Sequence, residues 1–395
     1  MPSELRVDNI NSTTSPYDPV FSTTGGALSH RNLIINGAMQ VSQIGDGQTH
    51  ASSSTAYTAC DRFQLYHGNN GAATTNHVAG PTEHGFANAL HVDITTLDTG
   101  LTATDRADII YSFEGKELQH ICKGTSSAKP LTLSFWVKSP KTGIHVIEFY
   151  DTDNSRHVCK TYTVATANTW EKHSVNIPAD TTGAFSNDVN KSLEAHWWLL
   201  AGSNYTSGTL PTTWASATTA NRAVGQVNVY DNASNNFYLT GVQLELGTVV
   251  TPFEHKSYQD ELQRCKRYFQ LVGSIIGSGY QNGTSSVILS GSAGGLKDDT
   301  GGGKTGGGGT LGAVGFRADP TITGTFGTAA IASAGGNGHF ATNTISGINW
   351  DQTNSTVTLS TSESIGNNTN GADDNRLATV YFNGKVILFR AELNS

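Results

Sequence analysis

The stretch "LTLSFWVKS", which runs from Leu131 to Ser139, decides the fold class because its side chains alternate strictly between apolar and polar. One set of positions is apolar and consists of Leu131, Leu133, Phe135 and Val137. The other set consists of Thr132, Ser134, Trp136 and Lys138. A period of two with one apolar face is typical of a half-buried strand in an antiparallel sheet.

The same alternation recurs over about 220 residues, with turn residues between the segments. It is found in "HVIEFYD" (145–151), "WEKHSVNI" (170–177), "QVNVYD" (226–231) and "GVQLELG" (241–247). In the last of these, Val242, Leu244 and Leu246 share one face. Many short strands at regular spacing indicate a sandwich or jelly roll, so the sequence predicts an all-β, jelly-roll domain over residues 31–253.

The composition excludes several classes of protein. Charged residues make up 14% of the chain, and the net charge is −8. This balance argues against nucleic-acid binding through phosphate neutralisation. No apolar run approaches the roughly 20 residues of a membrane span, so we expect no membrane insertion. The polar N-terminal sequence lacks the features of a signal peptide, so synthesis in a cytoplasm is expected.

Four cysteines are widely spaced, at Cys60, Cys122, Cys159 and Cys265. No C-x-x-C pair occurs, which makes a zinc site unexpected. Free, partly buried thiols are the favoured interpretation. The sequence predicts no metal site and no cofactor.

A helix is expected after Pro252. The residues Tyr258, Leu262, Cys265, Phe269 and Val272 are spaced by four, three, four and three positions, as in a coiled-coil seam. This spacing predicts a linking helix over residues 254–274. Two heptads are too few for a helix that stands alone, so it packs either on its own domain or on copies of itself. Spacing alone favours packing on its own domain.

The chain divides into four parts on this reading. Residues 1–30 are polar and turn-rich, as in an attachment arm. Alternation resumes after residue 275 in "TVTLS" (356–360) and "ATVYFNGKVILFRAEL" (378–393), where Asn383-Gly384 predicts a hairpin turn. The glycine-rich segment 291–312 predicts a mobile loop. Residues 275–395 therefore read as a second, smaller β-domain.

Motifs for catalysis are not found. "GGGKT" (301–305) resembles a phosphate-binding loop, but Asp298 stands where the first glycine is required. "DTDNSRH" (151–157) offers oxygens for Ca²⁺, although a polar hairpin turn is favoured. Glycoside hydrolysis needs two facing carboxylates, and nothing in the sequence selects a pair. We therefore expect a protein without enzymatic activity.

Sugar binding has better candidates, because the C–H faces of sugars stack on aromatic rings while polar side chains contact the hydroxyls. Aromatic residues that lie among Asn, Ser and Thr are Trp197, Trp198, Tyr205 and Trp214, and Trp350 is a further candidate. In a strand, one of two adjacent tryptophans points inward and the other outward. Core positions for both tryptophans remain the favoured alternative.

Three segments resemble a domain common in tail-fibre and virion structural proteins of tailed bacteriophages. They are "HRNLIINGAMQVSQIG" (30–45), "YTACDRFQLY" (57–66) and "GVQLELGTVVTPFEHKSYQDELQRCKRYF" (241–269). "FRADPTIT" (316–323) and "ILFRAEL" (387–393) resemble the small β-sandwich that often follows it. "SELRVDNINST" (3–13) is similar to the virion-attachment starts of such fibres.

This resemblance implies a jelly roll of the carbohydrate-binding-module kind, fused to a distal β-sandwich in a homotrimeric fibre of the virion. It implies that the N-terminal arm binds other tail or baseplate proteins and that the fibre recognises a host surface glycan or lipopolysaccharide. It also moves the helix toward a threefold axis, where its seam would join three chains. Two alternatives stay open: a structural baseplate or head-decoration protein, and a glycan-degrading tailspike enzyme.

Overall fold

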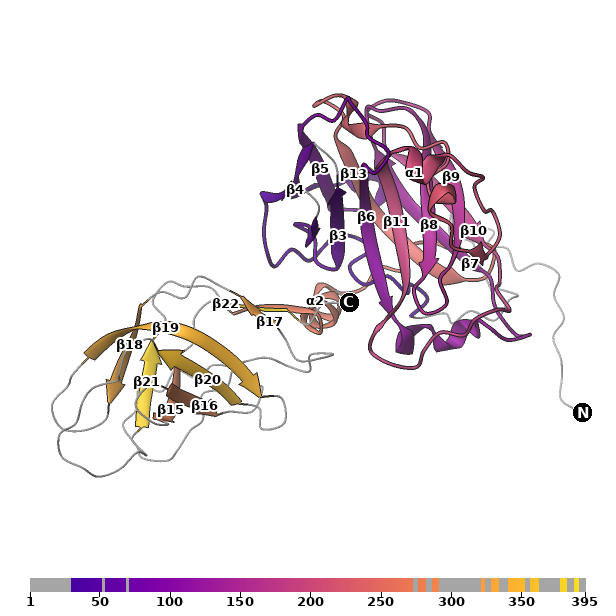
Figure 1. The fold of residues 1–395 in the computed structure, drawn as a ribbon. Helices are drawn as coiled ribbons and strands as arrows, with labels where there is room; N and C mark the ends of the chain where they lie inside the picture. The colour runs from indigo at the N-terminus through magenta and orange to yellow at the C-terminus, as the bar shows by residue number, and fades with distance from the viewer. Residues whose placement is uncertain are drawn as a thin grey trace, which may run out of the picture.

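The computed structural model describes residues 30–51, 54–68 and 71–272, together with eight strands between residues 276 and 390. The arm and the glycine-rich segment lie outside the described residues. Residues 48–246 form a sandwich of two antiparallel sheets, seen as two layers in Figure 1. Within the described part of the chain, no helix has the length and apolar character needed to cross a membrane.

The first sheet has six strands, and the last strand of the sandwich lies in its middle. Their order is β1 (Gln48–Ala51), β4 (Ala72–Ala79), β5 (Asn88–Thr96), β13 (Phe237–Leu246), β7 (Leu131–Lys138) and β10 (Glu171–Ile177). Strand β13 pairs with β5 on one side and β7 on the other. The final strand of the sandwich therefore lies between two strands that come much earlier in the sequence.

The second sheet has seven strands. Their order is β12 (Ala215–Ser216), β9 (Arg156–Val164), β8 (Gly143–Asp151), β11 (Lys191–Ala201), β6 (Arg106–Glu114), β3 (Phe63–Gly68) and β2 (Ser54–Tyr57). The described strand pairs in both sheets are antiparallel, as expected for a jelly roll.

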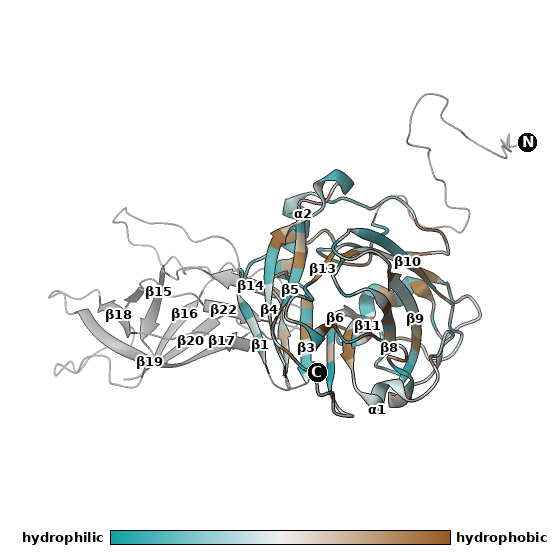
Figure 2. Cartoon of the chain, turned by 90° about the horizontal axis from the view of Figure 1, so that it is seen from above, coloured by the Kyte–Doolittle hydropathy of each residue, from teal (hydrophilic) through white to brown (hydrophobic). Residues whose placement is uncertain are grey.

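One hydrophobic core fills the space between the sheets, and it confirms the alternation of the opening stretch. Leu131, Leu133, Phe135 and Val137 of β7 all belong to it. Val242 and Leu244 of β13 are fully buried there, and Leu246 packs against the core. Apolar and polar residues alternate along the strands of the sandwich in Figure 2. The expected all-β sandwich is therefore present.

Short helical turns connect the strands: η1 (Thr82–His84), η2 (Gly115–Ile121), α1 (Ser203–Thr206), η3 (Thr219–Asn221) and η4 (Val229–Asp231). The last of these corrects one expectation, since "QVNVYD" was expected to be a strand. Val229 is buried as alternation requires, but the Asn228 side chain accepts a hydrogen bond from the backbone N–H of Tyr230. That cap starts a 3₁₀ turn in place of strand pairing.

All four cysteines are free. Cys60, Cys159 and Cys265 are buried, as expected for thiols that act as small apolar side chains.

The helix α2 (Tyr258–Lys266) is shorter than the sequence predicted, which is a correction to the 254–274 helix. Its N-cap is Ser257, whose hydroxyl accepts a hydrogen bond from the N–H of Asp260 at 3.2 Å. The chain then changes to strand β14 (Phe269–Val272). Phe269 and Val272 therefore belong to a strand and do not continue a helical seam.

The packing of α2 also corrects the idea of a seam between copies. Cys265 has no exposed surface and lies in a cluster with Ile35, Val41 and Tyr268, against which Leu262 packs. The spacing argument for packing on the same domain is thus supported at these two positions. Tyr258 is 52% exposed and contributes nothing to this cluster.

Polar contacts hold the same helix to the sandwich. The Glu261 carboxylate accepts a hydrogen bond from the backbone N–H of Asn36. The Arg267 guanidinium contacts both oxygens of Glu114, at 2.8 and 3.1 Å. The guanidinium of Arg62 lies 3.4 Å from the centre of the Tyr268 ring, within the range of a cation–π contact. These contacts explain why a β-sandwich ends on a helix: α2 and the two residues after it pack against the sandwich.

Beyond α2 the strands form two groups. β14, β22 (Ile387–Arg390) and β17 (Thr321–Thr323) form a three-stranded sheet. A closed barrel contains β15 (Ile276–Gln281), β16 (Ser286–Ser290), β20 (Thr356–Thr361), β19 (Phe340–Asp351), β18 (Thr328–Ser333) and β21 (Leu377–Tyr381). The strand expected at "TVTLS" is β20. A second β-sandwich in this region stays a prediction.

The prediction of a hairpin across Asn383-Gly384 is wrong. The flanking strands β21 and β22 do not pair with each other among the described residues, since β21 pairs with β15 and β18, and β22 pairs with β14 and β17. The turn residues themselves lie outside the described residues. A strong local turn signal was therefore outweighed by pairing between distant strands.

Candidate functional site

The two adjacent tryptophans are buried, which supports the favoured alternative of core positions and corrects the proposal that they contact sugar. Trp197 and Trp198 have no exposed surface. Trp197 points into the main core, whereas Trp198 points to the outer face of the seven-stranded sheet. There it packs with Val146, Cys159 and Ala223, so chain folded over that face covers the ring. Neither ring can stack on a sugar in this structure.

The other described candidates, Tyr205 and Trp214, have different surroundings. Tyr205 is partly exposed, and its ring lies 5.4 Å from that of Trp198. Trp214 packs on the main core, and its indole N–H donates to the carbonyl of Pro178 at 2.8 Å. Trp350 is in β19, and its side chain lies outside the described residues. Among the described candidates, Trp197, Trp198 and Trp214 pack against core residues, so they do not form one exposed surface with Tyr205.

A different set of aromatic residues gathers on the outer face of the six-stranded sheet. Strand pairing places Asn76 of β4, His91 of β5, Tyr238 of β13 and Lys138 of β7 in one row. Their strand neighbours Leu90, Val92, Leu239 and Val137 point into the core. Because side chains alternate along a strand, the row points outward.

The side chains in this row stack on one another. The rings of His91 and Tyr238 are 4.4 Å apart and inclined by only 5°. On the next strand, the Lys138 ammonium lies 4.2 Å from the centre of the Tyr238 ring and 5.3 Å from that of Trp170. Trp170 directly precedes β10 and meets Tyr238 at 6.1 Å. The side chains of His91, Trp170 and Tyr238 are all partly exposed.

A second pair lies one row away on the same face. Trp136 of β7 faces outward between Thr240 of β13 and Lys172 of β10. The His84 ring stacks on it at 4.0 Å and 18°. We name these residues the aromatic platform: His84, His91, Trp136, Lys138, Trp170 and Tyr238. It combines rings that keep exposed surface with the polar side chains of Asn76 and Lys172, whereas the Thr240 hydroxyl is buried and donates to the Asn88 carbonyl.

A bulge in β13 makes room for Trp136. The register of β13 against β7 shifts between Thr240 and Gln243, at Gly241. Gly241 has φ +60°, and a Cβ there would meet the rings of Phe86 and Trp136 at 2.7 and 2.8 Å. Only glycine fits this conformation and this contact without strain.

Sequence reasoning missed this platform although the signal was in the opening stretch. Trp136 belongs to the polar set of an alternating strand, with Thr132, Ser134 and Lys138. A large aromatic residue in the solvent-facing set of a half-buried strand is the signal. Tyr238 has the same position in its own strand, next to the buried Phe237. Without the strand order, the sequence could not show which outward-facing rings contact one another.

The outer face of the seven-stranded sheet carries charges that satisfy one another. The Arg106 guanidinium contacts both oxygens of Asp108, at 2.5 and 3.0 Å. His196 Nδ1 lies 2.7 Å from Asp108 Oδ2, and its Nε2 lies 3.5 Å from Glu194 Oε2. Burial alone would raise the pKa of Glu194, but its contacts with His196 and Lys191 lower it to about 2. This face is an ion-pair network.

His196 gives the network a pH dependence. Burial alone would lower its pKa, but the contacts with Asp108 and Glu194 outweigh burial, so the pKa is raised. A raised pKa in the folded state adds stability that is complete below the unfolded value of about 6.5 and is lost as pH rises through the folded pKa. We expect His196→Gln to be destabilising by about 1–3 kcal/mol at pH 5.5.

The measurement is urea unfolding of both proteins at pH 5.5 and pH 9. The difference between wild type and His196→Gln should shrink at pH 9. A difference that is constant across this range, or that grows with pH, would contradict the assignment of a stabilising proton to His196.

Glu148, His157 and Cys159 are the described residues that come nearest to a metal site. All three are buried, and their candidate ligand atoms lie within 4.8 Å of one another. The Glu148 carboxylate already contacts Arg222 Nε at 2.9 and 3.0 Å and His157 Nδ1 at 3.0 Å. Burial and the Glu148 charge raise the pKa of Cys159, so it stays a thiol. Because Arg222 supplies the positive charge, the cluster fits an internal ion pair better than a metal site.

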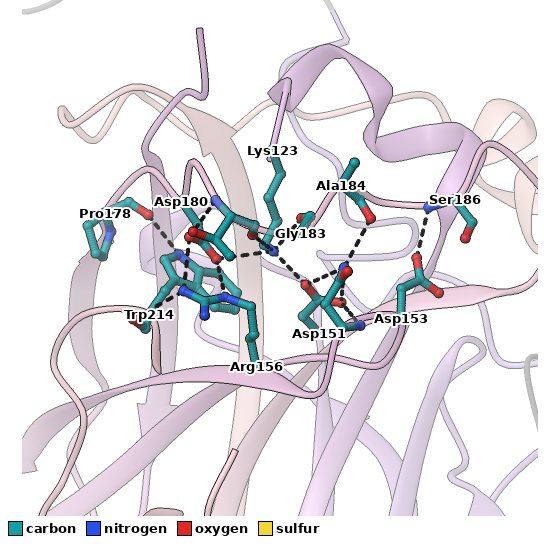
Figure 3. A network of polar contacts seen from close by, with 12 residues as sticks. Lys123, Asp151, Asp153, Arg156, Pro178, Asp180, Gly183, Ala184, Ser186 and Trp214 are labelled. Carbon is teal, nitrogen blue, oxygen red and sulfur yellow. Dashed lines mark hydrogen bonds and ion pairs between the residues drawn. The ribbon is translucent and has the colours of Figure 1, made fainter. Parts of the chain in front are cut away.

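A second buried ion network lies at the end of the sandwich and is shown in Figure 3. The Lys123 ammonium contacts Asp151 Oδ2 at 2.5 Å and Asp180 Oδ2 at 3.1 Å. It also donates to the carbonyls of Thr182 and Gly183, at 2.9 and 2.8 Å. The Arg156 guanidinium contacts both oxygens of Asp180, at 2.8 and 3.1 Å.

This network settles the role of "DTDNSRH". Asp151 accepts from Lys123 and from Asn154, and Asp151 pairs with Arg156 across the β8–β9 turn. The segment is thus a polar hairpin turn, as the sequence favoured, in which a lysine supplies the positive charge.

Comparisons with known proteins give no family for the chain. No protein-family model matches it, and no curated protein sequence matches it. Among solved structures, the enzymatically active domain of tailspike protein 4 of bacteriophage CBA120 is 14% identical, with a TM-score of 0.27. That match covers 55% of this chain and 21% of the tailspike, so the chain spans about a fifth of that structure.

Two carbohydrate-binding modules are also similar. The family 11 module of Clostridium thermocellum, solved with a mixed-linked tetrasaccharide, is 14% identical with a TM-score of 0.26 and covers 53% of this chain and 99% of the module. TmCBM61, solved with β-1,4-galactotriose, is 7% identical with a TM-score of 0.26. That match covers 55% of this chain and 99% of TmCBM61. Scores this low do not bear on function, and the sandwich assignment rests on the strand pairing itself.

Proposed function

We propose that the chain binds glycans through the aromatic platform. The observation that carries this proposal is the row in which His91, Tyr238, Lys138 and Trp170 stack outward from the six-stranded sheet. Aromatic rings that keep exposed surface on a sheet face can stack on the C–H faces of sugars. Asn76 and Lys172 stand beside the rings and supply hydrogen-bonding groups for hydroxyls.

The proposed place of this binding is the tail of a bacteriophage. The segments at 30–45, 57–66 and 241–269 resemble the tail-fibre domain, and a glycan site suits an appendage that adsorbs to a host surface. In this proposal three chains form a fibre, and residues 1–30 attach it to the virion. Three weak sites on one rigid trimer would then act together on a repetitive polysaccharide.

We further propose that the chain binds glycans without cleaving them. The six platform residues include no carboxylate, whereas hydrolysis of a glycosidic bond generally requires two facing carboxyl groups. Release of reducing ends from a bound polysaccharide would overturn this part of the proposal.

Adsorption is the test of the whole function. The purified chain should compete with the parent virions for host cells, and its mass in light scattering should equal three chains. A chain that binds surface polysaccharide but leaves adsorption unchanged would indicate a structural virion protein. A stable monomer at micromolar concentration would remove the multivalent mechanism.

A further inference from the structure

The Lys138 ammonium is held between two rings but contacts no oxygen among the described residues. Its Nζ lies 4.2 Å from the centre of the Tyr238 ring and 5.3 Å from that of Trp170. Cation–π contacts fix the position of an ammonium but leave its N–H donors free. Three donors are therefore available at the centre of the platform.

Other partly buried lysines of the sandwich have an oxygen partner for the ammonium, which Lys138 lacks among the described residues. Four of them place the ammonium against an oxygen: Lys141 on Asp231, Lys160 on the Thr212 carbonyl, Lys191 on Glu194 and Lys256 on Glu254. Because Lys138 is only partly buried, water can satisfy its donors in the free protein, and an oxygen of a ligand can replace that water. An ammonium at a proposed ligand surface that keeps its donors unused is suited to an acceptor on the ligand.

The charges around Lys138 leave it without a neutralising partner. No carboxylate of the described residues lies within ion-pair distance of its ammonium. Lys172, the register partner of Trp136, adds a second positive charge to this face. Acidic residues border the platform without pairing with Lys138: Glu83 lies 4.0 Å from His84, and burial together with the Asp93 carboxylate raises the pKa of Tyr238. The chain as a whole is negative, at −8, so positive charge here is a local feature.

We propose that the platform selects an anionic saccharide, with Lys138 as the residue that contacts its acidic group. This inference rests on the proposed function, because it assigns a ligand class to the same surface. In the complex, the sugar ring stacks on Trp170 while the ammonium donates to a carboxylate or sulfate oxygen. Such charge-assisted hydrogen bonds are about twice as strong as neutral ones.

The experiment measures the affinity of the full chain for two matched pairs of polymers. Polygalacturonate is compared with its methyl ester, and dextran sulfate with dextran, so each pair differs in charge on the same backbone. The wild type should prefer the charged member of at least one pair by about tenfold, the usual scale of one charge-assisted contact. Lys138→Gln should remove that preference, and Lys138→Arg should keep it.

A matched control separates this contact from general charge effects. Lys116→Gln makes the same charge change at an exposed lysine in η2, and it should leave the preference unchanged. If Lys116→Gln lowers it as much as Lys138→Gln does, the effect is non-specific and the proposal fails. If both members of each pair bind equally, the charge inference fails while glycan binding stands. If the wild type binds no saccharide, neutral or charged, the proposed function fails as well.

Discussion

Replacing Lys123 with methionine is expected to lower the free energy of unfolding by about 3–5 kcal/mol, because it leaves the buried Asp151 carboxylate without its positive partner. The Lys123 side chain is 2% exposed, and those of Asp151 and Asp180 are 0% and 5% exposed. Methionine matches the length of lysine but contributes no charge and no donor. Asp180 keeps Arg156, whereas Asp151 keeps only the hydrogen bonds from Asn154.

Urea unfolding monitored by circular dichroism measures this loss. Lys129→Met is the matched control, since Lys129 is exposed and lies six residues away, and a change within about 0.5 kcal/mol is expected for such a site. If Lys123→Met is as mild as Lys129→Met, the network does not hold the loops at this end of the sandwich together.

Removing two rings from the platform is expected to abolish most glycan affinity. Each aromatic contact is worth about 0.5–1.5 kcal/mol beyond its buried area, so Trp170→Ala with Tyr238→Ala should weaken binding by roughly a hundredfold. Because both side chains are partly exposed, the fold should survive the change. Titration of the saccharide that the wild type binds best, with each variant checked by thermal unfolding, measures the effect.

Tyr150→Ala is the control for this pair. Tyr150 is also a partly exposed tyrosine, but it pairs with Glu194 on the opposite outer face of the sandwich. Its removal should leave the affinity within about twofold, the scale expected for a residue outside the site. A larger loss from Tyr150→Ala than from the platform variant would place the site on the seven-stranded sheet.

The sandwich could be predicted because its strands obey a local rule. Alternation in β7 and β13 identifies the buried side of each strand from sequence alone, and Phe135 and Leu244 lie where it predicts. The strand order is not local, since β13 inserts between β5 and β7 from about 100 residues or more away. The platform depends on that insertion. Its outward aromatic residues could be identified one by one from the sequence, but their proximity in the sheet could not be predicted.

For Trp198, the direction of the side chain could be predicted but its burial could not. Its outward position followed from alternation, but its burial depends on the 202–223 segment that folds back over the sheet. The helix α2 ended early for a related reason. Its a/d spacing continues to Val272, yet Phe269 to Val272 pair with β22, a strand more than 100 residues further along the chain. Spacing reports local preference, and pairing with a distant strand overrode it.

The most direct test of the glycan-binding face is a fluorine NMR titration of the chain labelled with 5-fluorotryptophan. The six tryptophans give six signals, assigned by single Trp→Phe variants. Adding the bound saccharide should shift the signals of Trp136 and Trp170 and leave those of the buried Trp197 and Trp198 unchanged. Shifts confined to Trp214 or Trp350, with Trp136 and Trp170 unmoved, would contradict the platform as the binding site.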